Sequence, residues 1–168
     1  MLSPKVERAI YIGIIAVLSI TLLVFGKQEL SLKSQIPASP DELYKLLGNP
    51  KITIQVIDVR PYAPPNEDEE PDDDYMYYTQ IHIPGSIPVP DCDINKAPKE
   101  AREQINPYLP TFVISENGDP KAYEKCKGKF IIVRNVIGGI KMWDEVKGYP
   151  ADEGEYEPPQ AGGGGGCL

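Results

Sequence analysis

The chain is poor in the residue types that most often carry catalysis or bind metals. Its 168 residues include one histidine, three cysteines and one tryptophan. Cys92, Cys126 and Cys167 form no C-x-x-C pair, and with His82 as the only histidine they do not have the spacing of a zinc site. We therefore expect no metal and no cofactor.

Positive charge is also scarce. The chain has 17 Lys and Arg against 25 Asp and Glu, a net charge of −8. Lys5, Arg8 and Lys27 lie in the first 27 residues, so the remainder is more acidic still. Because a phosphate backbone must be neutralised by lysine and arginine, the composition argues against nucleic-acid binding. An acidic body suits a basic protein partner, although acidity is more often a means of staying soluble.

The chain has one long hydrophobic run, from Ala9 to Gly26, and it contains no charge. As a helix it would be roughly 27 Å long, which just crosses the hydrocarbon core of a bilayer. A cleaved signal peptide is the alternative, but Val24-Phe25-Gly26 is a mediocre cleavage site and the apolar region is long for one. We expect a membrane anchor over residues 1–27 and a polar tether over 28–38.

The short positive lead before this run bears on the orientation of the chain. An N-terminal anchor of this kind usually leaves its C-terminal domain outside the cytoplasm. We therefore expect a single-pass membrane protein with a cytoplasmic N-terminus and an extracytoplasmic domain, periplasmic if the source is bacterial.

Residues 39–151 alternate between apolar runs and helix signals. Ser39, Pro40 and Glu42 have the pattern of a capping box at a helix start. Strands are predicted over Ile52–Val59, Ile87–Pro90, Thr111–Ser115 and Phe130–Val133, and further helices over Lys96–Asn106, from Gly118 or Asp119 to Lys127, and from Gly138. This alternation is typical of a mainly parallel sheet covered on both faces.

Two segments have the composition of loops. Residues 66–78 begin with seven carboxylates in nine residues and end in Tyr75-Met76-Tyr77-Tyr78. The acidic part repels itself and predicts a solvated insertion, whose base the tyrosines would cover. It lacks the EF-hand pattern with its glycine, so we do not expect calcium binding. Residues 152–168, with the glycine run 162–166, predict a flexible tail.

Three motifs in order resemble the rhodanese-like family. They are Val56-Ile57-Asp58-Val59-Arg60, then His82-Ile83-Pro84-Gly85-Ser86-Ile87-Pro88-Val89-Pro90, and last Gly138-Gly139-Ile140-Lys141-Met142-Trp143 with Gly148-Tyr149-Pro150. The resemblance implies a three-layer α/β/α domain with a five-stranded, mainly parallel sheet, here preceded by one transmembrane helix. It also implies that Asp58 and Arg60 hydrogen-bond near the central loop, that His82 is a structural turn residue and that Trp143 is core.

In active members of this family the central strand ends in a cysteine that carries sulfur as a persulfide. By position Ser115 stands at that place, and a serine hydroxyl cannot form a persulfide. The resemblance thus indicates a degenerate loop and no catalytic residue, the loop being Ser115, Glu116, Asn117, Gly118, Asp119 and Pro120. Lys121 follows at the spacing of the arginine in related Cys-x5-Arg phosphatases, and we interpret it as a solvated helix residue.

The loop's charges point the same way. Glu116 is negative where a basic residue is common, Asp119 adds a second carboxylate, and Pro120 lacks an N–H. Each carboxylate would oppose an incoming thiosulfate by about 3 kcal/mol at ~5–6 Å and an effective dielectric of ~20, before screening.

The sequence therefore favours a catalytically inactive rhodanese-like module at a membrane, acting as a protein-interaction or accessory subunit of a membrane complex. Its protein partner would dock on the acidic loop Glu67 to Asp74 or on the C-terminal tail. The first alternative is a sulfurtransferase with a relocated thiol at Cys92, or a serine-based variant. The second is a sensor domain for a small polar ligand or a cation. Cys92 and Cys126 fit either a disulfide in an oxidising compartment or two buried apolar residues.

Overall fold

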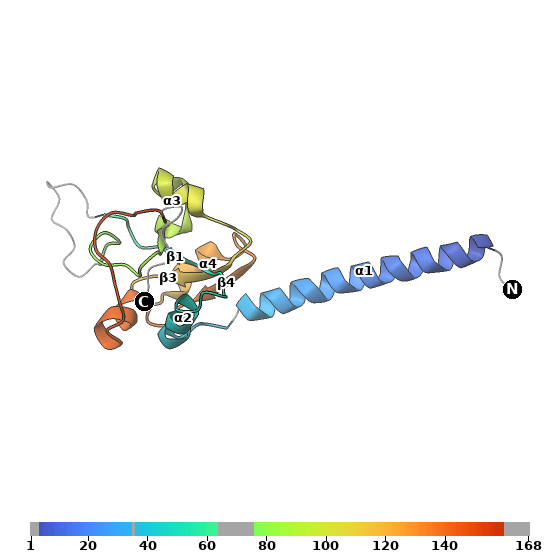
Figure 1. Cartoon of the computed structure of the whole chain (residues 1–168), viewed down its shortest axis with the longest axis horizontal. Coiled ribbons are helices and arrows are strands. Elements are labelled where there is room, and N and C mark those ends of the chain that lie inside the picture. Colours follow the sequence, from blue (N-terminus) through green and yellow to red (C-terminus); the bar gives the residue numbers. More distant parts are fainter. Residues whose placement is uncertain (1–3, 35, 64–75, 160–168) are drawn as a thin grey trace.

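The structure is a computed structural model that describes residues 4–34, 36–63 and 76–159. A long helix, α1 (Pro4–Ser34), projects away from an α/β domain (Figure 1). The domain contains the helices α2 (Pro40–Leu47), α3 (Lys99–Gln104), α4 (Pro120–Cys126) and α5 (Gly139–Lys141), and the strands β1 (Gln55–Asp58), β2 (Ile87–Pro88), β3 (Pro110–Ile114) and β4 (Ile132–Asn135). Two short 3-10 turns, η1 (Pro90–Cys92) and η2 (Ile94–Lys96), precede α3, and a π turn, η3 (Met142–Val146), follows α5.

The described strands form one parallel sheet in the order β2-β1-β3-β4. It has four strands where five were expected. The place beside β4 is taken by an isolated parallel bridge between Ala38 and Val136. Pro37 and Pro40 flank this bridge, and because proline has no N–H to donate, the ladder cannot extend far on either side.

The core lies on both faces of the sheet because successive strand residues point to opposite sides. Ile57 of β1 packs with residues of α3 and α4, including Ala101 and Cys126. Its neighbour Val56 packs on the other face with Leu43 of α2 and Ile140 of α5. The three-layer α/β/α architecture expected from the sequence is therefore confirmed.

The start of α2 is as the sequence predicts. The Ser39 hydroxyl accepts a hydrogen bond from the backbone N–H of Glu42, and Pro40 occupies the first turn. The Glu42 carboxylate also reaches the guanidinium of Arg134 in β4, at 2.5 and 2.9 Å. This bidentate ion pair connects α2 to β4, the edge strand of the sheet.

Several boundaries differ from the sequence predictions. β1 begins at Gln55, three residues later than expected, and β4 lies two residues further along the chain than Phe130–Val133. The helix expected over Lys96–Asn106 is shortened to α3 because Pro98 stands just before its first turn rather than inside it.

The ordered part of the domain also continues past Ala151, the boundary expected from the sequence. Asp152 pairs with His82 in an antiparallel bridge, and Tyr156 is 9% exposed within the core. A flexible tail was expected from residue 152, but residues 152–156 belong to the ordered domain. The acidic run Glu67 to Asp74 and the glycine run with Cys167 lie outside the described residues.

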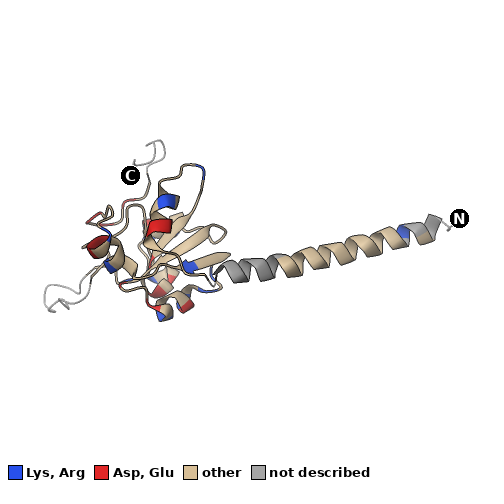
Figure 2. Ribbon diagram, turned by 90° about the horizontal axis from the view of Figure 1, so that it is seen from below, with Lys and Arg blue, Asp and Glu red and all other residues tan. Residues whose placement is uncertain are grey.

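The described side chains of α1, from Ile10 to Phe25, are all exposed, for example Ile12 at 67% and Leu22 at 74%. In Figure 2 the stretch from Ile10 to Phe25 is drawn in tan, because it contains no acidic or basic residue. Among the residues that the structure describes, no helix is long and apolar enough to cross a membrane. The expected membrane anchor stays a prediction.

Candidate functional site

A cleft of about 350 Å³ opens at the carboxyl ends of β1 and β3. This is the end of a parallel sheet at which α/β proteins place their ligands. The cleft brings together the central loop predicted from the sequence and residues that follow β1 and β2. Its lining consists of Val59, Arg60, Asp91, Ser115, Glu116, Asn117, Asp119, Lys121, Ala122 and Lys125.

The loop after β3 is closed by its own hydrogen bonds. Ser115 is 5% exposed, and its hydroxyl accepts a hydrogen bond from the backbone N–H of Asp119 at 2.8 Å. The Asp119 carboxylate in turn accepts from the N–H of Lys121 at 2.8 Å and caps α4. Pro120 contributes no N–H. The loop has the expected concave shape, but these backbone donors are not available to a bound anion.

Two glycines allow this loop to lie directly against the start of α5. A Cβ on Gly139 would lie 2.0 Å from the Ser115 carbonyl oxygen, and a Cβ on Gly118 would lie 2.6 Å from the Gly138 nitrogen. The Ser115 and Glu116 carbonyls accept hydrogen bonds from the N–H groups of Ile140 and Lys141. The sequence shows Gly138-Gly139 as part of a motif, but it does not indicate this close contact.

The charges around the cleft are largely paired with one another. The Glu116 carboxylate lies 2.5 Å from the Lys141 ammonium, and Asp91 lies 2.7 Å from Lys125 and 2.6 Å from Lys96. Hydrogen bonds from Lys125 and Lys96 lower the pKa of Asp91 to about 2. Since the cleft neutralises its own charges, it does not offer the net positive field that a thiosulfate-like anion requires.

Asp58 and Arg60 form a buried pair beside the cleft. Both oxygens of Asp58 accept from the Arg60 guanidinium, at 2.6 to 3.2 Å, and the two side chains are 0% and 1% exposed. Arg60 also donates to the backbone carbonyls of Met76 and Ile81. The role expected for this pair near the central loop is confirmed.

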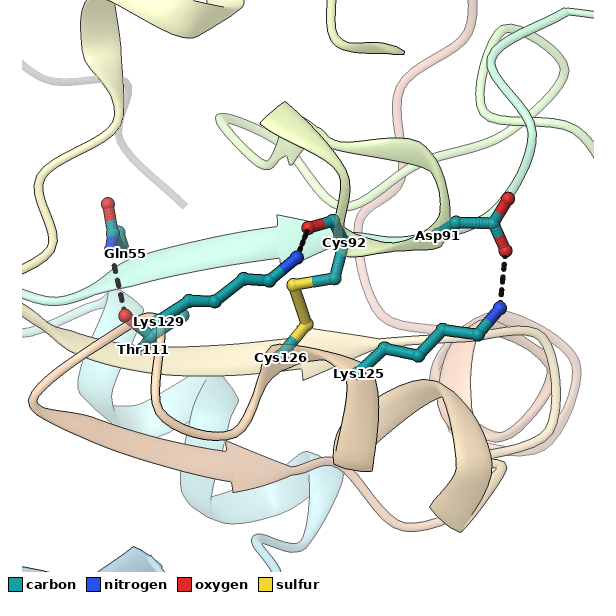
Figure 3. The surroundings of a disulfide bond; sticks show 7 residues. All are labelled: Gln55, Asp91, Cys92, Thr111, Lys125, Cys126 and Lys129. Atoms are coloured by element: carbon teal, nitrogen blue, oxygen red, sulfur yellow. Dashed lines mark hydrogen bonds and ion pairs between the residues drawn. A yellow bond between two sulfur atoms is a disulfide. The ribbon is translucent and has the colours of Figure 1, made fainter. Parts of the chain in front are cut away.

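Cys92 and Cys126 are joined by a disulfide (Figure 3). Both residues are fully buried, and the bond connects η1 to the last residue of α4. Asp91 and Cys92 have φ values of 55° and 57°, a left-handed conformation that costs on the order of 1–3 kcal/mol for a residue other than glycine. Lys129 donates to the Cys92 carbonyl and holds the same turn.

The other residues singled out from the sequence have structural positions. His82 is 6% exposed, contacts the Tyr78 carbonyl through Nδ1 at 3.0 Å and stacks on the Tyr78 ring, and burial lowers the pKa of its imidazole. Trp143 is fully buried and donates to the Pro150 carbonyl. Tyr77 and Tyr78 are buried as expected for residues that cover the base of the insertion. Lys121 is exposed, as expected, but it also lines the cleft.

The arrangement can bind a polar group but lacks an evident nucleophile. Ser115 lies at the cleft, and within the described chain no group of three or more His, Cys, Asp or Glu side chains is placed to hold a metal ion. Both described cysteines are in the disulfide and have no thiol in this state.

Comparisons with known proteins agree with this fold. The family model of the rhodanese-like domain matches residues 39–145, which is more than half of the chain. No curated protein matches. Among solved structures, the BH2092 protein of Bacillus halodurans is 18% identical with a TM-score of 0.50, over 77% of this chain and 84% of its own.

Two further structures are similar at lower TM-scores. The rhodanese-like domain of the Alr3790 protein of Anabaena sp. is 19% identical with a TM-score of 0.48, over 77% of this chain and 87% of its own. SseA of Escherichia coli, a 3-mercaptopyruvate sulfotransferase, is 21% identical with a TM-score of 0.49, over 73% of this chain and 53% of its own. At these identities the structural likeness concerns the fold alone. On the family match, the chain belongs to the rhodanese-like domain family.

Proposed function

We propose that this protein is a non-catalytic member of its family that acts as an interaction module of a membrane complex. One observation carries the proposal: Ser115 lies at the cleft where active members carry the persulfide-forming cysteine. A serine hydroxyl has a pKa far too high to ionise without a base. Its oxygen here already accepts the Asp119 N–H, and the described His82 is buried against Tyr78.

The relocated thiol at Cys92 is the competing proposal, and the disulfide argues against it. Cys92 is fully buried and bonded to Cys126, so that sulfur transfer would first require reduction and then exposure of the turn. The binding of a small polar ligand is supported less directly, by the hydroxyl, amide and carboxylate groups that line the cleft.

The membrane part of the proposal is supported by α1. From Ile10 to Phe25 its side chains are exposed, uncharged and mostly apolar on all sides, and a helix of that kind is stable when an apolar medium or another chain surrounds it. The disulfide supports an extracytoplasmic position for the domain because such bonds persist in oxidising compartments. The acidic composition supports a partner with a basic surface.

Persulfide trapping on the full-length protein in mild detergent tests the absence of catalysis. The protein is first reduced and freed of reductant, which gives the relocated thiol its best opportunity, and is then supplied with thiosulfate or 3-mercaptopyruvate. We expect no persulfide on Cys92 or Cys126 and no transfer to cyanide. A persulfide on Cys92, with turnover that is lost in Cys92→Ala, would establish the competing proposal.

Extraction and pull-down experiments test the anchor and the partner. Under alkaline carbonate extraction we expect the full chain to stay with membranes, and release into the supernatant would contradict the anchor.

A pull-down from detergent-solubilised membranes tests the partner. It compares the native chain with a variant in which the acidic residues from Glu67 to Asp74 are changed to their amides, and it identifies proteins that need the acidic loop. Recovery of the same proteins by both chains would remove this loop as the docking site.

A further inference from the structure

The Cys92–Cys126 disulfide is buried next to two residues that line the cleft. The residues next to the two cysteines, Asp91 and Lys125, both line the cleft and form an ion pair at 2.7 Å (Figure 3). The disulfide and this ion pair thus join the same two segments, η1 and the end of α4.

The η1 turn is in a conformation that it would not keep by itself. Asp91 and Cys92 are consecutive residues with positive φ, and neither is glycine. Such a conformation persists where surrounding contacts hold it. Here those contacts are the disulfide, the bond from Lys129 to the Cys92 carbonyl, the ion pairs of Asp91 with Lys96 and Lys125, and backbone hydrogen bonds of the turn itself.

These contacts differ in strength. Asp91, Lys96 and Lys125 are each about half exposed, and ion pairs at such positions contribute little. The disulfide is covalent and fully buried. Among these contacts it is the covalent one, and it joins the left-handed turn to the last residue of α4.

We propose that the Cys92–Cys126 disulfide is a redox-sensitive clamp that fixes the shape of the cleft. This inference rests on the proposed function, in which the cleft belongs to a binding surface, and it names the regulation of that surface. When a dithiol reductant attacks, two electrons and two protons pass to the S–S bond. Cys92 and Cys126 become thiols and the reductant becomes a disulfide. The η1 turn then relaxes, and the wall formed by Asp91 and Lys125 opens.

Amide hydrogen exchange on the full chain tests the clamp. The chain carries Cys167→Ser, so that Cys92 and Cys126 are the only cysteines that can be oxidised or reduced. Three amides report on the turn: those of Asp91, Cys92 and Asp93, which donate to the carbonyls of Val59, Val89 and Pro90 at 2.8 to 3.0 Å. On complete reduction, verified by alkylation and mass, we expect these amides to exchange about tenfold faster or more. The Ala38 amide, bonded to Asn135 at the opposite edge of the sheet, should change by less than about twofold.

Two variants separate the disulfide from its neighbours. Cys126→Ser removes the bond without reductant and should reproduce the fast exchange of the turn. Lys125→Met keeps the bond and removes the ion pair with Asp91, and should leave the Cys92 amide slow. Fast exchange in Lys125→Met, equal to that of the reduced protein, would overturn the proposal, because the ion pair would then be the clamp.

The remaining outcomes are equally decisive. Unchanged exchange at Asp91 and Cys92 after full reduction would overturn the proposal. Loss of protection throughout the sheet would also overturn it and would make the bond a global structural link. Sulfur transfer by the native protein would contradict the proposed function and leave this test standing, since the exchange of the turn does not depend on catalysis.

Discussion

At the scale of single residues, Gly139 determines whether the Ser115 loop and α5 can touch. Its φ is +55°, and a Cβ there would meet the Ser115 and Glu116 carbonyl oxygens at 2.0 and 2.6 Å. Both obstacles are backbone atoms, so neither can rotate away. We expect Gly139→Ala to lower the free energy of unfolding by about 3 kcal/mol or more, as measured by urea denaturation.

Gly128→Ala is the matched control for this substitution. Gly128 also has a positive φ, +84°, but nothing lies within 4 Å of a Cβ built there. Its substitution carries only the backbone penalty, and we expect a loss of about 1 kcal/mol. If both variants lost the same free energy of unfolding, the close contact of Gly139 with the Ser115 loop would make no contribution to the loss.

Ser115 has a structural role besides its position at the cleft. Its hydroxyl is the acceptor for the Asp119 N–H, and Ser115→Ala leaves that donor without this partner. We expect a loss of about 1–2 kcal/mol in the free energy of unfolding. Ser115→Thr retains the hydroxyl and should lose less. A Ser115→Ala protein as stable as the native one would mean that the loop is held by its contacts with α5 alone.

At the scale of elements, Asp91 links η1 to η2 and to α4 through Lys96 and Lys125. Hydrogen bonds from these lysines hold the pKa of Asp91 at about 2, below its ordinary 3.8. A carboxyl whose pKa is lowered by folding stabilises the protein above its unfolded pKa, and this contribution is lost as the pH falls through the folded pKa. The loss should therefore fall between about pH 4 and pH 2.

Asp91→Asn isolates this contribution. We expect the native protein to exceed the variant in free energy of unfolding by about 1 kcal/mol or less at pH 6, because the pair is half exposed. The difference should vanish near pH 2. Glu103→Gln, on the exposed side of α3, is the control for the removal of a carboxylate. A difference that stays constant over this pH range would contradict the role of Asp91.

The elements were predictable to different degrees, for physical reasons. β1 and β3 are short apolar runs followed by polar residues, and Ser39 with Pro40 begins α2, so local chemistry was enough to place them. The Glu42–Arg134 pair joins residues 92 positions apart, and no local pattern indicates it. Three cysteines left open whether Cys92 and Cys126 pair. The contact at Gly139 depends on how closely α5 approaches the loop after β3, and this distance cannot be predicted from local sequence patterns.

The candidate site was predicted in place but not in detail. The cleft lies at the loop identified from Ser115 to Pro120, because ligand sites of parallel sheets lie at the carboxyl ends of strands. The contributions of Asp91 and Lys125 were missed. Asp91 follows β2, the neighbour of β1, and its position at that same end of the sheet is the signal that could have revealed it.

At the scale of the whole molecule, the segment after Ala151 holds together the two ends of the insertion. Tyr156 is buried beside Tyr62 and Tyr78, which precede and follow the undescribed residues 64–75, and its N–H donates to the Tyr62 hydroxyl. The Tyr62 and Tyr78 rings stack at 5.7 Å. The sequence did not indicate this because Tyr156 is a single aromatic residue in an otherwise acidic segment.

We expect Tyr156→Ala to lower the free energy of unfolding by about 2–4 kcal/mol, since it leaves a cavity in the core. It should also speed exchange of the Tyr78 and Thr79 amides, which donate to the Pro61 and Tyr62 carbonyls. Glu157→Ala, at the exposed neighbouring position, should stay within about 0.5 kcal/mol of the native protein. If both variants were as stable as the native chain, the domain would end near Ala151 after all. Faster exchange at Tyr78 and Thr79 in Tyr156→Ala would show instead that the C-terminal segment holds these two residues against Pro61 and Tyr62.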